Sequence, residues 1–206
     1  MSTKKNSSAK MRVKIANDVL SQLTAGNLTP QTGTWLAFNE FDLCELVAEE
    51  ADRVVEIPSA ICKIVKAAGG CEACALGAIF MSAIRKGRSC GDFSIRDEEW
   101  SAHGALELQD HIFTKLDRSP LTKYFPVRML QQIENCFEGG GGVHSVSIDA
   151  MDGVIAELYH ETFCGDRERM RAIMNNIVRN GGNFKPTQDI NPQQLAEARE
   201  NVASLR

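Results

Sequence analysis

Apolar residues recur every three or four positions through most of the chain, a spacing that predicts amphipathic α-helices. The first such run begins at Lys10 and ends before Gly26. The most regular run begins at Asp166, which we expect to cap a helix, and closes at Gly181 and Gly182. Its predicted buried stripe consists of Met170, Ile173, Met174, Ile177 and Val178.

The same spacing predicts helices in further segments, separated by Gly, Pro and polar residues. These segments are 41–57, 58–70, 71–87, 105–116, 127–138 and 150–164. The last of them has Asp149 as a natural N-cap, whereas the end of the first, RVVEI, also suits a strand. Residues 32–38 (TGTWLAF) are rich in β-branched and aromatic side chains, which favours a short extended segment.

These elements predict a mainly α fold, a compact bundle of about eight helices with at most a minor β element. The polar residues 1–9 are expected to be a disordered N-terminus. Residues 10–185 are expected to form a single helical domain, and residues 186–206 a C-terminal helical tail. Within the domain, four consecutive glycines at 139–142 predict a Gly-rich hinge.

Composition narrows the class of protein. With 206 residues, 43% of them apolar, the chain can bury one substantial core. Its formal net charge of −4 argues against a surface that attracts nucleic acid everywhere, although a local basic face stays open. No stretch approaches the roughly 20 apolar residues of a membrane-spanning helix, and no apolar core of a signal peptide follows the first lysines, so we expect a cytoplasmic protein.

Seven cysteines, an odd number scattered through apolar segments, indicate reduced thiols rather than a disulfide scaffold. Cys71 and Cys74 form a Cys-x-x-Cys motif, which at a helix N-terminus can be a redox dithiol. The segment before them is predicted to be a helix, however, and not the strand that precedes a thioredoxin-like motif. Redox catalysis is therefore the weaker interpretation of this pair.

The same two cysteines could supply half of a zinc site. The remaining ligands would come from Cys62, Cys90, His103 or His111, but none of these forms the second close pair that structural zinc sites usually have. Free cysteine otherwise behaves as a small buried apolar residue. We therefore interpret Cys71 and Cys74 as packing residues that let another helix approach closely, and we predict no metal and no other cofactor.

The clearest candidate ligand site is a basic row on the helix that begins at Asp166. Four-residue spacing places its members on one predicted solvent face, with Arg169 beside them. The row consists of Arg167, Arg171, Asn175 and Arg179. Because the arginine fork suits carboxylate and phosphate, the row could bind an acidic partner, a nucleotide or a nucleic-acid backbone. The alternative is a solvated face that makes only surface ion pairs.

No residue pattern predicts catalysis. The sequence contains no GxxxxGK[ST] phosphate loop, no GxGxxG after a strand and no HExxH. His160 and Cys164 are four residues apart and could face one another, but nothing nearby supplies an orienting Asn or Asp. We therefore expect a protein that is not an enzyme.

Three segments, MRVKIANDVLSQLTAG (11–26), CEACALGAIFMSAI (71–84) and RMRAIMNNIVRNGGNFKP (169–186), resemble segments of small uncharacterised proteins of bacteriophages and prophages. The resemblance implies a viral accessory protein that acts in the cytoplasm of a bacterial host. It carries no catalytic or ligand-binding residue with it.

Together these observations predict a non-enzymatic phage accessory protein that binds and inhibits a host component or sequesters an anionic signalling ligand. Such a protein would serve anti-defence or host takeover. We expect a homo-oligomer whose partner is a host protein or an anionic nucleotide-like ligand, with nucleic acid less favoured and no membrane. Two alternatives stay open, a metal- or thiol-dependent regulator that uses Cys71 and Cys74, and a nucleic-acid-binding module.

Overall fold

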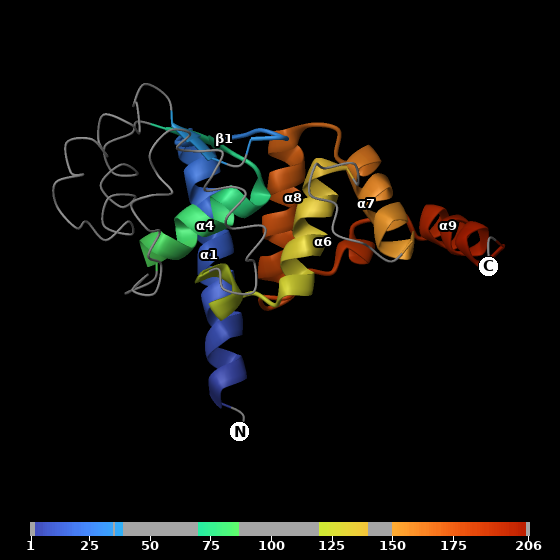
Figure 1. The fold of residues 1–206 in the computed structure, drawn as a ribbon, viewed down its shortest axis with the longest axis horizontal. Helices are drawn as coiled ribbons and strands as arrows, with labels where there is room; N and C mark the ends of the chain where they lie inside the picture. Colours follow the sequence, from blue (N-terminus) through green and yellow to red (C-terminus); the bar gives the residue numbers. More distant parts are fainter. Residues whose placement is uncertain (1–2, 35, 39–69, 87–119, 140–149, 205–206) are drawn as a thin grey trace, which may run out of the picture.

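The computed structural model of this chain describes residues 3–34, 36–38, 70–86, 120–139 and 150–204. In these ranges the fold is mainly helical with a small sheet, as the sequence predicts (Figure 1). The α-helices are α1 (Thr3–Ala25), α4 (Ala75–Lys86), α6 (Val127–Glu138), α7 (Ala150–Thr162), α8 (Asp166–Arg179) and α9 (Pro192–Ser204). The predicted count of about eight is not supported, because the described residues contain these six.

Several sequence predictions lie outside the described residues. They are the helices at 41–57 and 105–116, the helix at 58–70 up to residue 69, the glycines 140–142 and the N-cap at Asp149. Gly139, the first glycine of the predicted hinge, is described: it ends α6 in the left-handed conformation, with φ 83°.

The first helix is longer than its apolar pattern predicts. α1 begins at Thr3, so residues 3–9, which their polar composition predicts to be disordered, are helical. Its middle is fixed by packing, since the Arg12 guanidinium donates to the backbone oxygens of Gly182 and, at 2.6 Å, of Tyr124. Once that segment is helical, each residue added at its end gains a backbone hydrogen bond at little extra entropic cost.

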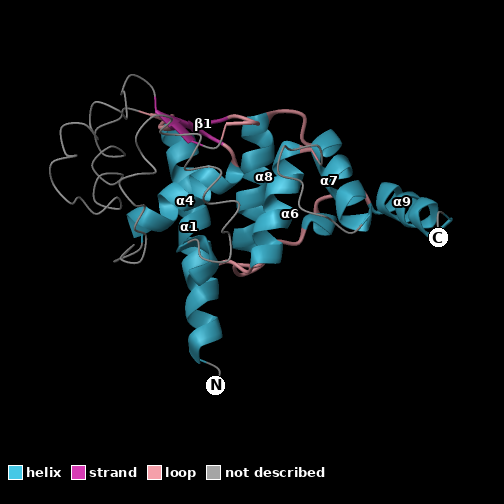
Figure 2. Ribbon diagram, viewed as in Figure 1, coloured by secondary structure: helices cyan, strands magenta, loops and turns pink. Residues whose placement is uncertain are grey.

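The β element is a sheet of three-residue strands beside α1, drawn in magenta in Figure 2. β1 (Leu28–Pro30) pairs in parallel with β3 (Cys71–Ala73), and β2 (Leu36–Phe38) pairs antiparallel with the other edge of β3. β2 lies within the segment 32–38 for which the sequence favours an extended structure. The sheet therefore joins two stretches of chain that are some forty residues apart in the sequence.

The helix predicted at 71–87 is wrong at its start. Cys71 lies on β3, and α4 begins only at Ala75. The cause is pairing with distant residues: the Cys71 amide donates to Asn27 O (3.0 Å), and the Gln31 amide donates to Ala73 O (3.1 Å). A local apolar pattern contains no information on these bonds, which outweigh the helical preference of the segment.

The helices pack around a shared core. α1 lies against α8 and α4, and α6 lies against α4, α7 and α8 (Figure 1). The last helix, α9, contacts α7. The largest fully buried apolar side chains include Tyr159, Phe80, Phe125, Phe137, Ile15 and Leu23. One ion-pair cluster joins α1 to α4: buried Asp18 contacts Arg85 Nε at 3.2 Å and Lys86 Nζ at 3.0 Å.

The stripe predicted on α8 is confirmed, with one correction at the N-terminus of the helix. Met170, Ile173, Met174 and Ile177 are fully buried, and Val178 packs against the same core. Gly165 occupies the N-cap position, whereas Asp166, the predicted cap, is the first helical residue. Its carboxylate instead accepts a hydrogen bond from the Thr32 amide (2.8 Å), far away in the sequence.

The end of the chain is helical where the sequence predicts a helical tail. A short 3₁₀ turn (Pro186–Gln188) precedes α9, and Leu195 is the one buried residue of that helix. None of the described helices is long and apolar enough to cross a membrane.

Candidate anion-binding site

The four residues of the basic row are all exposed on α8, at the four-residue spacing that the sequence predicts. They differ, however, in what they contact. Two arginines are held by other parts of the fold, and the two residues between them make no hydrogen bond or ion pair with any described residue. The residues of the row therefore share one helix face but have different surroundings.

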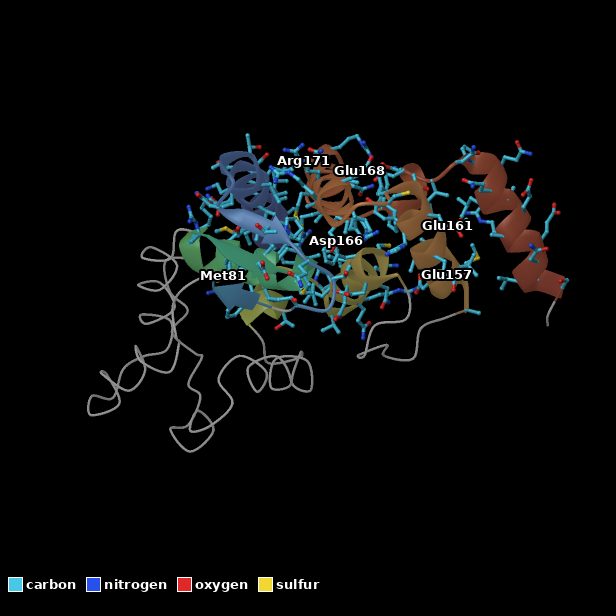
Figure 3. The ribbon with its side chains drawn as sticks, turned by 90° about the horizontal axis from the view of Figure 1, so that it is seen from above. Met81, Glu157, Glu161, Asp166, Glu168 and Arg171 are labelled. Carbon is cyan, nitrogen blue, oxygen red and sulfur yellow. The ribbon has the colours of Figure 1, made fainter. Side chains whose placement is uncertain are left out.

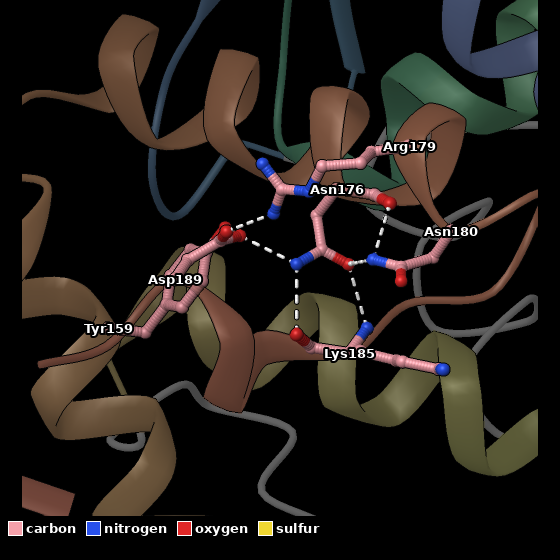
Figure 4. A network of polar contacts seen from close by, with 6 residues as sticks. All are labelled: Tyr159, Asn176, Arg179, Asn180, Lys185 and Asp189. Carbon is pink, nitrogen blue, oxygen red and sulfur yellow. Dashed lines mark hydrogen bonds and ion pairs between the residues drawn. The ribbon is translucent and has the colours of Figure 1, made fainter. Parts of the chain in front are cut away.

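Arg179, at the C-terminal end of the row, forms an ion pair with Asp189 (Figure 4). Asp189 also accepts hydrogen bonds from the side-chain amide of Asn176 (2.6 Å) and from the Tyr159 hydroxyl (3.3 Å). The guanidinium charge is thus balanced by a carboxylate that belongs to a structural network. The predicted role of Arg179 in binding stays a prediction.

Arg167, at the N-terminal end of the row, donates to the backbone oxygen of Leu23 near the end of α1. This bond adds a second donor to a carbonyl in the last turn of α1, which also accepts from the Gly26 amide at 3.4 Å. It uses one guanidinium nitrogen and leaves the charge of Arg167 without a carboxylate partner among the described residues. Arg167 therefore both ties α8 to α1 and keeps positive charge at the surface.

Arg171 and Asn175 occupy the centre of the row. Figure 3 shows Arg171 where α8 borders α1, with Glu168 on the side of α8 nearer α7. The neighbouring helix α1 exposes two further cations, Lys10 and Lys14. α1 runs antiparallel to α8, with Leu23 beside Arg167 at one end and Ala9 beside Gly182 at the other, so Lys10 and Lys14 lie along the C-terminal half of α8.

Arg169 is not part of this surface, contrary to the prediction that it lies beside the row. Its side chain is only 2% exposed. The guanidinium donates to Phe163 O at 2.9 Å and forms an ion pair with Asp166. It also lies over the Phe137 ring, 5.6 Å from the ring centre. Its Nε has no hydrogen-bond partner. A helical wheel contains the signal, since residue 169 lies four positions before Ile173 and so falls on the apolar stripe.

The cysteine pair has the properties of packing residues. Cys74 is 5% exposed in the core, and burial raises its pKa to about 12. Cys71 is half-buried, and burial raises its pKa to about 11. Both thiols are thus protonated at neutral pH, whereas nucleophilic and metal-binding cysteines act as thiolates. The motif begins on strand β3, not at a helix N-terminus, and burial raises the pKa values of both thiols, whereas redox-active thiols have lowered ones.

The metal alternative gains no support in the described part of the chain. Among those residues no three His, Cys, Asp or Glu side chains come together as a metal site would require. Cys62, Cys90, His103 and His111, the predicted additional ligands, lie outside them.

His160 and Cys164 do not form a pair. The Cys164 thiol is exposed and donates to Glu161 O at 3.4 Å. His160 instead lies against the end of α6, where a Cβ on Gly139 would come within 2.8 Å of its ring. Burial and the charge of Arg169 lower the pKa of His160, so its ring is neutral at neutral pH.

A cluster of carboxyl groups lies around the turn between β1 and β2, and the sequence does not reveal it. Asp166 accepts from the Thr32 amide and hydroxyl, at 2.8 and 3.3 Å, and Glu138 accepts from the Gly33 amide at 2.8 Å. Glu134 lies one turn before Glu138 on α6, and burial raises its pKa to about 8. These groups come from two helices, α6 and α8, and meet at a turn far from both in the sequence, so no local spacing places them around it.

Comparison of this chain with protein-family models, with curated proteins and with solved structures finds no match.

Proposed function

We propose that this chain is a non-enzymatic binding protein that holds an anionic partner on the exposed row of α8, with Arg171 as the central contact. The supporting observation is that Arg171 is exposed and makes no hydrogen bond or ion pair with a described residue, while Arg167 beside it is held in place by Leu23 O. A guanidinium without a partner can offer its full donor fork to a carboxylate or phosphate.

The charges exposed along α1 and α8 favour an anion. α1 contributes Lys10 and Lys14 at its surface, and Asp18, the one acidic residue of α1, is buried and paired with α4. Positive charge is therefore concentrated along α1 and α8, although the whole chain carries a net charge of −4. Such a local field steers an acidic partner toward the row and weakens with added salt.

The acidic groups nearby limit the size of the partner. Glu168 on α8 and Glu157 and Glu161 on α7 are exposed (Figure 3). They would repel an extended polyanion that ran across both helices. We therefore favour an acidic protein surface or a single nucleotide-like ligand over nucleic acid.

The biological role that we propose is that of a phage accessory protein. In this role the row would block an acidic surface of a host component, or would sequester an anionic signalling ligand. The resemblance of residues 11–26, 71–84 and 169–186 to phage proteins supports it, and two of these segments cover most of α1 and most of α8, the helices that carry the basic face. The protonated state of Cys71 and Cys74 argues against the thiol-dependent alternative.

The test is charge reversal at Arg171. Immobilised wild-type chain, Arg171→Glu and Arg199→Glu would each be exposed to a bacterial lysate, and bound proteins and nucleotides would be identified by mass spectrometry. Arg199 is the matched control, because it is exposed on α9, away from the row. We expect Arg171→Glu to lose the bound partner by roughly tenfold or more while Arg199→Glu retains it. Equal retention by both variants would refute the proposed site.

A further inference from the structure

The turn that joins β1 to β2 is held by side chains from two distant helices. Thr32 is bound through its amide and hydroxyl by Asp166, the first residue of α8. Gly33 is bound through its amide by Glu138, the last residue of α6. Gly33 has φ 72°, a left-handed conformation that favours glycine and turns its amide toward that carboxylate. The position of the turn therefore depends on these two carboxyl groups.

Glu138 is poorly placed to keep a negative charge. It ends α6, where the helix dipole disfavours an anion, and it is partly buried, which raises its pKa. The hydrogen bond from the Gly33 amide partly offsets this cost, because it stabilises the charged carboxylate. A further negative charge nearby would weaken this arrangement directly.

Glu134 is the group that can supply such a charge. It precedes Glu138 by four residues, so the two side chains lie on the same face of α6. Burial raises the pKa of Glu134 to about 8, and repulsion by Glu138 adds to the shift. Glu134 is therefore protonated at neutral pH and ionises in the mildly alkaline range.

The charged and titratable groups that face this pair come from every helix packed on α6. They are Cys74 before α4, His160 on α7, and Asp166 and Arg169 on α8. Cys74 and His160 are uncharged at neutral pH, and Asp166 is negative and already bound to Thr32. The remaining cation is Arg169, which lowers the pKa of Glu138 and whose buried Nε has no hydrogen-bond partner.

We propose that the proton on Glu134 controls a latch, in which Glu138 holds the Thr32–Gly33 turn while Glu134 is protonated and leaves Gly33 when Glu134 ionises. The proton of Glu134 goes to solvent. The released Glu138 carboxylate turns toward Arg169, where it can relieve the cost of the unpaired Nε. The device does not depend on the proposed binding function, because no ligand takes part in it.

The latch releases the Gly33 amide and not the neighbouring Thr32 amide. Asp166 holds Thr32 through a separate bond, and it is paired with Arg169, so Thr32 stays bound when Gly33 is released. The two neighbouring amides should therefore respond differently to pH. This difference separates a local opening from a loss of the whole fold.

The experiment is hydrogen exchange of single amides, followed by NMR on the ¹⁵N-labelled full chain between about pH 6 and about pH 9 and corrected for the intrinsic pH dependence of exchange. In the wild type we expect the protection of the Gly33 amide to fall by roughly tenfold or more, since bonds to a charged acceptor are among the stronger ones. The Thr32 amide and the core amide of Ile177 should keep their protection.

Three variants complete the test. Glu134→Gln cannot ionise, so its Gly33 amide should stay protected at alkaline pH. Glu138→Gln should lose much of the Gly33 protection at every pH, and Glu157→Gln, exposed on α7, should behave as the wild type. The proposal is overturned if wild-type Gly33 protection does not change with pH, if Thr32 and Ile177 lose protection together with Gly33, or if Glu134→Gln loses it as the wild type does.

Discussion

At the scale of single residues, buried polar side chains fix the ends of helices and loops. Arg12, Arg169 and Asn176 are all buried, and each binds a backbone carbonyl outside its own helix. Their burial is offset by these bonds, because a polar group buried without a partner costs more than the bond itself contributes. A sequence shows only that these residues are polar, and not which carbonyl each will reach.

Asn176 is the clearest case for a stability test. Its side chain donates to Lys185 O (2.9 Å) and Asp189, and accepts from the Lys185 amide (2.7 Å), which holds the chain after α8 (Figure 4). We expect Asn176→Ala to lower the free energy of unfolding by about 2–3 kcal/mol, because it leaves the Lys185 amide unpaired and removes the side-chain bonds to Lys185 O and Asp189. Urea denaturation of the wild type and the variant measures this difference in the free energy of unfolding. The adjacent control Asn175→Ala, exposed on the same helix, should change it by less than about 0.5 kcal/mol.

Glu134 makes stability depend on pH. Its pKa is raised from 4.5 to about 8 in the folded chain, so the folded state holds this proton more tightly than the unfolded state. The resulting stabilisation is complete below pH 4.5 and is lost as the pH rises through about 8. We expect Glu134→Gln to be more stable than the wild type at about pH 9, on the order of 2 kcal/mol, with little difference near pH 4. Denaturation curves across this range would contradict the assignment if the two proteins changed in parallel.

At the scale of elements, regular patterns are predictable and long-range pairing is not. The stripe from Met170 to Ile177 follows helical spacing closely, and α8 forms as expected. The strand at Cys71–Ala73 depends on bonds to Asn27 and Gln31, so the apolar run that contains it gives the wrong element. The basic row was found because it is local, whereas the carboxyl groups around Gly33 come together only in the fold.

The contact between α1 and the end of α8 is equally hidden in the sequence, and glycine substitutions test it. Gly182 has φ 92°, and a Cβ there would lie 2.5 Å from Ala9 O, so α1 would have to shift. Gly181 also has positive φ (60°), but its Cβ would meet nothing within 4 Å. We expect Gly181→Ala to cost about 1 kcal/mol and Gly182→Ala at least about 2 kcal/mol more, as measured by thermal or urea unfolding. Equal costs would mean that α1 does not pack here.

At the scale of the whole molecule, charge is distributed unevenly between the described helices. α1 and α8 present Lys10, Lys14, Arg167 and Arg171 in an acidic chain, while α7 exposes Glu157 and Glu161. The fold uses Arg179 and Arg169 for its own stability and leaves Arg171 without a partner among the described residues. This division between structural and available arginines is the basis for a binding role.

Native mass spectrometry tests directly whether Arg171 holds an anionic partner. The wild-type chain and Arg171→Glu would be purified side by side from a bacterial lysate, at low salt because the contact is electrostatic. We predict that the wild type carries an additional mass, from an acidic protein or a nucleotide, and that Arg171→Glu lacks it. The same additional mass on both proteins, or none on the wild type, would contradict the claim that Arg171 holds an anionic partner.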